Sequence, residues 1–184
     1  VEVHSGEFTD LASYEWAKPA VALLAKKGSV TGKAEGIFAP QDKVTRAEFV
    51  KMILLTFDYS IEDSKSTFKD VSDDSWYKPY VMTAAKTGMV TGYSDEVFGA
   101  NDNITREDAT VIIARVLKSL NVSASENGEY IPFIDEELIS EYAKNAVFDM
   151  AKSGIVNGVS GNYFAPENNA TRAEASVMLS RMMS

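Results

Sequence analysis

The chain has 184 residues, of which 45% are hydrophobic and 24% are charged, enough for one or two folded domains with a core. Its formal net charge of −9 argues against broad, sequence-independent binding to nucleic acid or to an anionic membrane. No apolar run approaches the roughly 20 residues of a membrane span, and the lack of cysteine excludes disulfides, thiolate metal sites and cysteine catalysis.

The sequence contains three copies of one pattern, which runs in the same order each time. A Phe-x-Asp element opens each copy, and its aspartates are Asp10, Asp70 and Asp135. An aromatic residue follows, at Trp16, Trp76 and Tyr142. The repeats predict three units, residues 1–60, 61–125 and 126–184. We expect them to form one cooperative domain, because a unit of about 50 residues buries little apolar surface alone.

Each unit is predicted to consist of a helix, a structured loop and a second helix, so the expected fold class is all-α. In the first unit a helix should begin near Trp16 and end at Gly28. Its buried face is predicted to contain Ala17, Ala20, Val21, Leu23 and Leu24. Thr45 and Glu48 match a capping box that begins the second helix.

The loop of each unit carries a glycine after Val-Thr or Val-Asn, at Gly32, Gly92 and Gly158. We expect these glycines to adopt a positive φ angle, with close approach of a ligand as the alternative. The phenylalanines of each unit are assigned to the core. They are Phe8, Phe38, Phe68, Phe98, Phe133 and Phe164.

The second and third units depart from the first at several positions. Asp108 replaces glutamate in the second capping motif and should close the box less well, because its side chain is shorter. The third unit has Tyr142 for tryptophan, Asn157 for threonine and one extra residue after Asp135. Polar segments at 58–67 and 121–130 are expected to be linkers.

Arginine recurs at the residue after each capping threonine, at Arg46, Arg106 and Arg172. A capping box does not require arginine, and a cation is slightly unfavourable at a helix N-terminus. One interpretation is that the guanidinium, beside exposed helix amides, receives a carboxylate or phosphate ligand. The other is a salt bridge to a neighbouring unit, with Asp10, Asp70 and Asp135 as candidates. The spacing leaves both open.

Trp16, Trp76 and Tyr142 also have two interpretations, as plain core or as platforms on which sugar rings stack. Catalysis has little support, because the only histidine is His4 and no nucleophile stands with a base. The polar stretches at 70–75 and 101–103 lack the glycine and glutamate of a calcium-binding EF-hand loop. We therefore predict no enzyme activity, no metal and no cofactor.

The series Phe-x-Asp, Trp or Tyr, Val-Thr/Asn-Gly and Thr-Arg-Ala-Glu, in three copies over about residues 8–184, resembles the S-layer homology domain. The resemblance implies a three-pronged spindle around a central three-helix bundle. It also implies an extracellular domain that attaches a bacterial surface protein non-covalently to secondary cell wall polysaccharide, typically through its pyruvylated N-acetylmannosamine end.

In the family the ligand lies in grooves between prongs. By motif position the groove residues would be Arg46, Arg106, Arg172, Asp10, Asp70, Asp135, Trp16, Trp76, Tyr142, Gly32, Gly92 and Gly158. We expect the isolated domain to be a monomer. The alternative function is a module for protein–protein interaction or lattice assembly at the cell surface.

Overall fold

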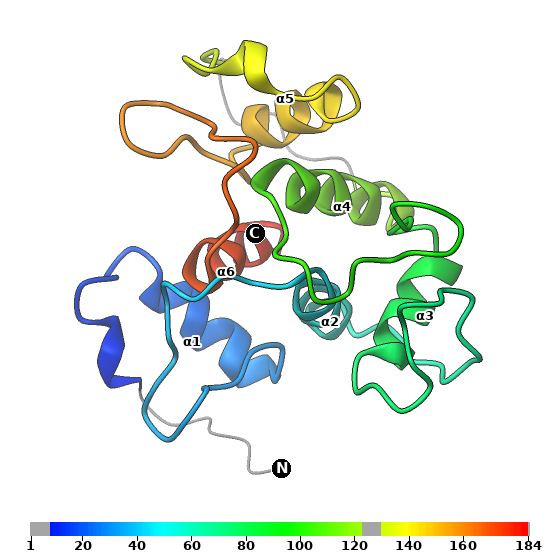
Figure 1. Ribbon diagram of the computed structural model, residues 1–184. Coiled ribbons are helices and arrows are strands. Elements are labelled where there is room, and N and C mark those ends of the chain that lie inside the picture. The colour runs from blue at the N-terminus through cyan, green and yellow to red at the C-terminus, as the bar shows by residue number, and fades with distance from the viewer. Residues whose placement is uncertain (1–7, 123–129, 184) are drawn as a thin grey trace.

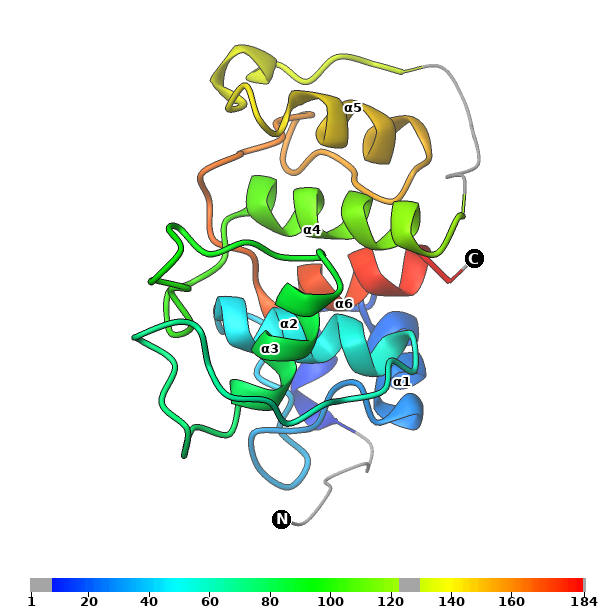
Figure 2. The same ribbon diagram turned by 90° about the vertical axis from the view of Figure 1, so that its right-hand side faces the viewer.

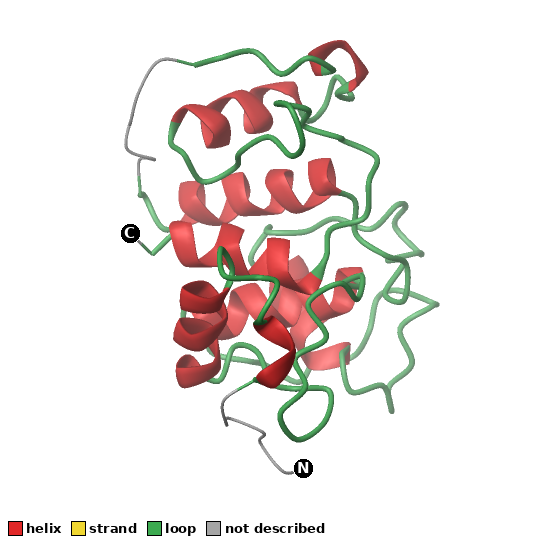
Figure 3. Cartoon of the chain, turned by 90° about the vertical axis from the view of Figure 1, so that its left-hand side faces the viewer, coloured by secondary structure: helices red, strands yellow, loops and turns green. Residues whose placement is uncertain are grey.

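The computed structural model describes residues 8–122 and 130–183, and within these ranges the fold is all-α, as predicted. His4 and most of the second linker lie outside the described residues. Helices and connecting loops make up the described chain (Figure 3). The α-helices are α1 (Lys18–Lys27), α2 (Arg46–Thr56), α3 (Lys78–Lys86), α4 (Arg106–Ser119), α5 (Lys144–Lys152) and α6 (Arg172–Arg181). Short 3-10 helices lie at Thr9–Leu11 and Glu136–Leu138.

The helix ends follow the predicted capping chemistry. At α2 the Thr45 hydroxyl accepts from the amide of Glu48 at 3.2 Å, and the Glu48 carboxylate accepts from the amide of Thr45 at 3.0 Å. At α4 only half of this box forms. The hydroxyl of Thr105 accepts from the amide of Asp108, but the carboxylate of Asp108 binds Arg46 instead of the Thr105 amide. Gly28 ends α1 with a φ of 74°, as expected for a helix C-cap.

The second helices of the units, α2, α4 and α6, lie at the centre, with the first helices α1, α3 and α5 outside them (Figure 1). Each first helix packs on the second helix of the preceding unit. Thus α3 packs on α2, α5 packs on α4, and α1 closes the circle by packing on α6. The side view shows α5 lying along α4 (Figure 2). The three units therefore form a closed cycle.

Backbone hydrogen bonds close the same cycle beside the N-termini of the central helices. The amide of Val44 donates to Ala170 at 3.0 Å, that of Ile104 to Val44 at 2.9 Å, and that of Ala170 to Ile104 at 3.0 Å. The first amide of each central helix also donates to the neighbouring unit, at 2.9 Å in all three cases, through Arg46, Arg106 and Arg172. The helix amides that we expected to be exposed are therefore occupied.

The core is formed largely by the residues that the sequence indicated. Phe38, Phe98 and Phe164 are fully buried, and Ala17, Ala20, Val21 and Leu24 of the first helix are buried as well. The prediction for Leu23 was wrong, because this side chain is 39% exposed. Val21 and Leu24 of the same helix are fully buried, so Leu23 lies on the side of α1 that faces solvent.

Candidate functional site

The repeated arginines are buried and reach into the next unit. Arg46 is 5% exposed. Its Nε donates to the carbonyl of Phe98 at 3.1 Å, and its Nη2 donates to the carbonyl of Thr91 at 3.2 Å. Its Nη1 forms an ion pair of 3.2 Å with the carboxylate of Asp108. All these partners belong to the second unit, so Arg46 joins the first unit to the second.

The other two arginines repeat this pattern around the cycle. Arg106 donates to the carbonyls of Phe164 at 2.8 Å and Asn157 at 3.1 Å, and pairs with Glu174 at 3.4 Å. Arg172 donates to the carbonyls of Phe38 at 2.9 Å and Thr31 at 2.6 Å. Arg46 and Arg106 do form salt bridges between units, but their partners are Asp108 and Glu174, the acids of the capping motifs. The proposed partners Asp10, Asp70 and Asp135 were wrong.

Those three aspartates hold the loops of their own units. Asp70 accepts from the amides of Phe98 at 2.8 Å and Gly99 at 2.7 Å, with one carboxylate oxygen for each. Asp10 and Asp135 make the same pair of bonds in their units, at 2.7–3.0 Å. Because Phe98 donates to Asp70 and accepts from Arg46, each aspartate positions the carbonyl that receives the neighbour's arginine.

The pKa of Asp70 yields a testable pH dependence. Partial removal of the carboxylate from water raises this pKa, but hydrogen bonds from backbone amides, those of Phe98 and Gly99 foremost, together outweigh this effect and lower the pKa. A carboxyl whose pKa is lowered by folding stabilises the protein above its unfolded value of about 3.9, and this contribution is lost as the pH falls through the lowered pKa.

We expect Asp70→Asn to reduce stability at pH 7 by about 1.5 kcal/mol, the lower end for hydrogen bonds to charged groups, because Asp70 is exposed. The loss should be smaller at pH 3. Urea denaturation at both pH values measures it, with the exposed Asp74→Asn as the control. An equal loss at both pH values would show that the charge of Asp70 is irrelevant.

The prediction of positive φ at Gly32, Gly92 and Gly158 was wrong, because the positive angles in these loops belong to other residues: Gly36, Ala39, Gly99, Gly161, Asn162 and Ala165. Close packing explains the earlier glycines. A Cβ atom at Gly32 would lie 2.8 Å from the carbonyl oxygen of Ala34 and 2.9 Å from the ring of Phe8. The loop thus folds too tightly on itself and on its opening phenylalanine for any side chain.

Two grooves open beside the arginines. The Arg46 groove has a volume of about 370 Å³ and is lined by Arg46 of the first unit, Thr91, Gly92, Tyr93, Asp108 and Arg115 of the second, and Tyr142 of the third. The Arg172 groove, of about 180 Å³, is lined by Arg172, Thr31, Gly32, Lys33, Glu48, Lys51 and Trp76. Each therefore combines residues from all three units, and neither lining includes Asp10, Asp70 or Asp135.

The repeated aromatic residues are exposed rather than part of the core. Trp76 is 53% exposed and Tyr142 is 60% exposed, each at the edge of its groove. Lys51 places its Nζ 5.4 Å from the centre of the Trp76 ring. Trp16 is 55% exposed. A half-exposed ring next to a cation can stack on a sugar while the cation binds an acidic substituent.

Tyr142 is fixed by two acids of the second unit, of which Glu107 has no acidic counterpart in the other units. Its hydroxyl donates to Asp108 at 2.8 Å and to Glu107 at 3.1 Å. The positions equivalent to Glu107 hold alanine in the other units, at Ala47 and Ala173. Burial, together with these two carboxylates, raises the pKa of Tyr142. The departures at Asp108 and Tyr142 are thus linked, because the tyrosine hydroxyl donates to the Asp108 carboxylate.

The third equivalent position, beside Arg106, is arranged differently. Asn157 replaces the threonine found at Thr31 and Thr91. With its amide nitrogen turned to the carbonyl of Val156, its side-chain oxygen accepts from the guanidinium of Arg181 at 3.2 and 3.1 Å. Arg181 also donates to the carbonyl of Ile155 at 3.4 Å. The cation at this position is thereby engaged by the loop.

Sequence reasoning missed the cations that line the grooves, Lys51 and Arg115. The available signal was a break in the repeat: Val111 and Val177 stand where the first unit has Lys51, and Leu55 stands where the others have Arg115 and Arg181. Over residues 8–122 and 130–183 no cluster of His, Cys, Asp and Glu could hold a metal ion. No helix in those ranges is long and apolar enough to cross a membrane.

Comparison with known proteins identifies the repeated unit. The profile of the S-layer homology domain matches residues 7–50, 67–110 and 133–176. An amylopullulanase of Thermoanaerobacterium thermosulfurigenes is 38% identical over 94% of this chain and 9% of its own length. The exoglucanase XynX of Acetivibrio thermocellus is 38% identical over 94% of this chain and 16% of its own length. The S-layer protein EA1 of Bacillus anthracis is 27% identical over 91% of this chain and 19% of its own length. The chain thus spans less than a fifth of the length of each of these three relatives.

Proposed function

Since this chain belongs to the S-layer homology domain family, it is an extracellular anchoring module of the bacterial cell wall, and we propose that its ligand is the pyruvylated N-acetylmannosamine end of secondary cell wall polysaccharide. The observation that carries this proposal is the pairing of a cation with a half-exposed aromatic ring in both grooves. Because this chain matches 9% and 16% of two enzyme relatives, we propose that their catalysis belongs to the remaining parts.

In the proposed complex the pyruvyl carboxylate meets Lys51 in the Arg172 groove and Arg115 in the Arg46 groove, while the sugar ring stacks on Trp76 or Tyr142. The buried arginines form the groove walls and hold the Val-Thr-Gly loops in place. These contacts are local, so the net charge of −9 adds only a repulsion that salt screens beyond roughly 10 Å. The isolated domain is proposed to bind as a monomer.

The grooves are proposed to be unequal. Arg181 occupies the place that Arg115 has in the Arg46 groove, but Asn157 and the carbonyl of Ile155 already bind it. A ligand beside Arg106 would have to displace these contacts. We therefore propose that this third position contributes least to binding.

Trp76→Ala is expected to weaken binding at the Arg172 groove about 2- to 10-fold, the range for loss of a stacked ring. The matched control is Trp16→Ala, which removes an equally exposed tryptophan at the third position and should change binding less. Calorimetry with a soluble pyruvylated sugar measures both. Protein-free cell walls, with and without the pyruvyl group, supply the second test. Equal binding to both wall preparations would refute the pyruvyl ligand.

One observation favours the alternative function as a lattice or protein-interaction module. Ile131, Ile134 and Leu138 of the third unit are 60–71% exposed. The residues equivalent to Ile134 are polar in the other units, at Thr9 and Lys69. If the protein self-associates through these aliphatic side chains and ignores purified walls, the alternative replaces the anchor.

A further inference from the structure

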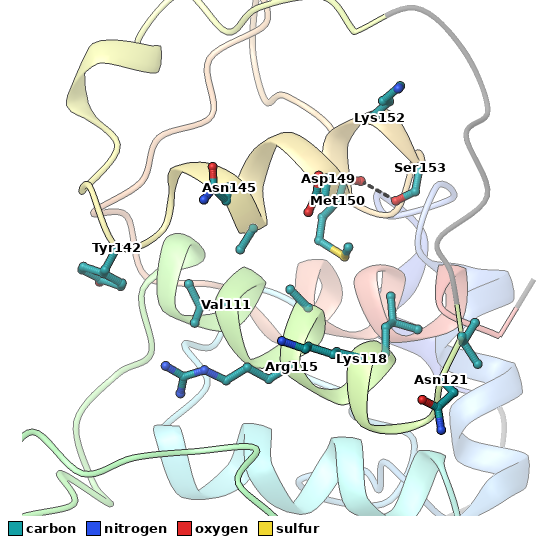
Figure 4. A pocket seen from close by; sticks show the side chains of 14 residues that line it. Val111, Arg115, Lys118, Asn121, Tyr142, Asn145, Asp149, Met150, Lys152 and Ser153 are labelled. Atoms are coloured by element: carbon teal, nitrogen blue, oxygen red, sulfur yellow. Dashed lines mark hydrogen bonds between the residues drawn. The ribbon is translucent and has the colours of Figure 1, made fainter.

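A larger groove lies between α4 and α5 and joins the Arg46 groove. It has a volume of about 830 Å³. Val111, Arg115 and Tyr142 line both grooves, so the two form one continuous surface. Figure 4 shows Tyr142 at one end and Asn121 at the other, with Arg115 and Lys118 along α4 between them. The groove runs from Val111 to Asn121, which at a rise of about 1.5 Å per helical residue is a length of roughly 15 Å.

The lining of this groove suits an anionic carbohydrate. Its small residues Ala114 and Ala146, one from each helix, leave room for a flat ring. Arg115 and Lys118 are exposed, and neither forms an ion pair with the residues that the structure describes. Asp149, on α5 opposite them, is also exposed and can accept hydrogen bonds from sugar hydroxyls.

The equivalent surface between α2 and α3 has different chemistry. Leu55 stands in place of Arg115, and Asp58 stands in place of Lys118. The first linker also lies on α3, because the amide of Glu62 donates to the hydroxyl of Thr83 at 3.0 Å. Thr83 occupies the position of Asp149. The cationic groove is thus a property of the α4–α5 pair and is not repeated there.

We propose that the α4–α5 groove is an extended subsite that binds the sugar units next to the polysaccharide end held in the Arg46 groove. This inference rests on the proposed function of the Arg46 groove. Arg115, shared by both grooves, lies where the terminal sugar gives way to the next one. Lys118 then meets an acidic substituent of the adjoining units, and Asp149 meets their hydroxyl groups.

The test compares two ligands by calorimetry: the pyruvylated N-acetylmannosamine monosaccharide, and a polysaccharide fragment of several repeats with the same end. The wild type should bind the fragment more tightly than the monosaccharide. Lys118→Asp introduces the residue that the first unit has and should weaken fragment binding about 3- to 10-fold. Monosaccharide binding should stay unchanged. Lys118→Gln should act in the same direction with a smaller effect.

Lys26→Asp is the matched control, because it makes the same charge change at an exposed position in the last turn of α1. It should leave both affinities unchanged. Equal affinity of the wild type for the two ligands, or equal effects of Lys118→Asp and Lys26→Asp, would overturn the extended subsite. If the wild type does not bind the monosaccharide but fragment binding still depends on Lys118, the proposed function of the Arg46 groove fails, while polysaccharide binding in the α4–α5 groove is supported. If the wild type binds neither ligand, both proposals fail.

Discussion

A chain that ends after Leu120 is expected not to fold, although it contains two complete units. Truncation removes α5 and α6, which are the packing partners of α4 and α1. It also removes both carbonyls that accept from Arg106, and the acceptor of the Val44 amide, Ala170. Apolar faces of α1 and α4 would then be exposed to water at a cost of roughly 25 cal/mol per Å².

Circular dichroism and thermal melting of the 1–120 fragment test this expectation. Adding residues 121–184 as a separate chain is the control, because it restores every missing partner without the peptide bond. Helical signal and a melting transition should return only in the mixture. A 1–120 fragment that melts cooperatively by itself would show that the units are independent.

Replacement of Arg106 with alanine is expected to destabilise the domain by about 3–5 kcal/mol, the range for breaking a buried ion pair. Arg106 is 3% exposed, and the substitution leaves the carbonyls of Phe164 and Asn157 without the guanidinium donor and the carboxylate of Glu174 without its ion-pair partner. Burial lowers the pKa of Arg106, but an arginine remains charged at neutral pH.

Arg115→Ala, on the same helix, is the matched control for stability. Its side chain is exposed and forms no ion pair within the described part of the chain, so its loss should change stability by less than about 0.5 kcal/mol. Urea denaturation of both variants at pH 7 measures the difference. Similar stabilities for the two variants would mean that the cycle does not depend on its arginines.

Much of the fold could be predicted because local chemistry decides it. The caps at Thr45 and Thr171 and the glycine after α1 depend on residues a few positions apart, and the buried phenylalanines could be predicted from their apolar character. The weaker cap at Asp108 was predicted from side-chain length alone, and the structure confirms it.

The candidate site could not be predicted to the same extent, because its contacts cross between units. Arg46 meets Phe98 and Asp108, more than 50 residues away, and no spacing rule says which acid an arginine will choose. Gly32 was assigned a positive φ because that is the usual reason for glycine, whereas the reason here is the Phe8 ring beside it. Lys51 and Arg115 line the grooves at positions where the repeat breaks, which a search for repeated residues passes over.

The cycle of units has one junction that the polypeptide does not span. The first and second units, and the second and third, are joined by the chain itself, but the third and first meet through non-covalent contacts alone, among them α6 with α1, Arg172 with Phe38 and Thr31, and Val44 with Ala170. This junction also lies between the units that carry the two chain ends (Figure 1). Tension applied between the first and third units therefore acts on that seam directly, and we expect this junction to open first.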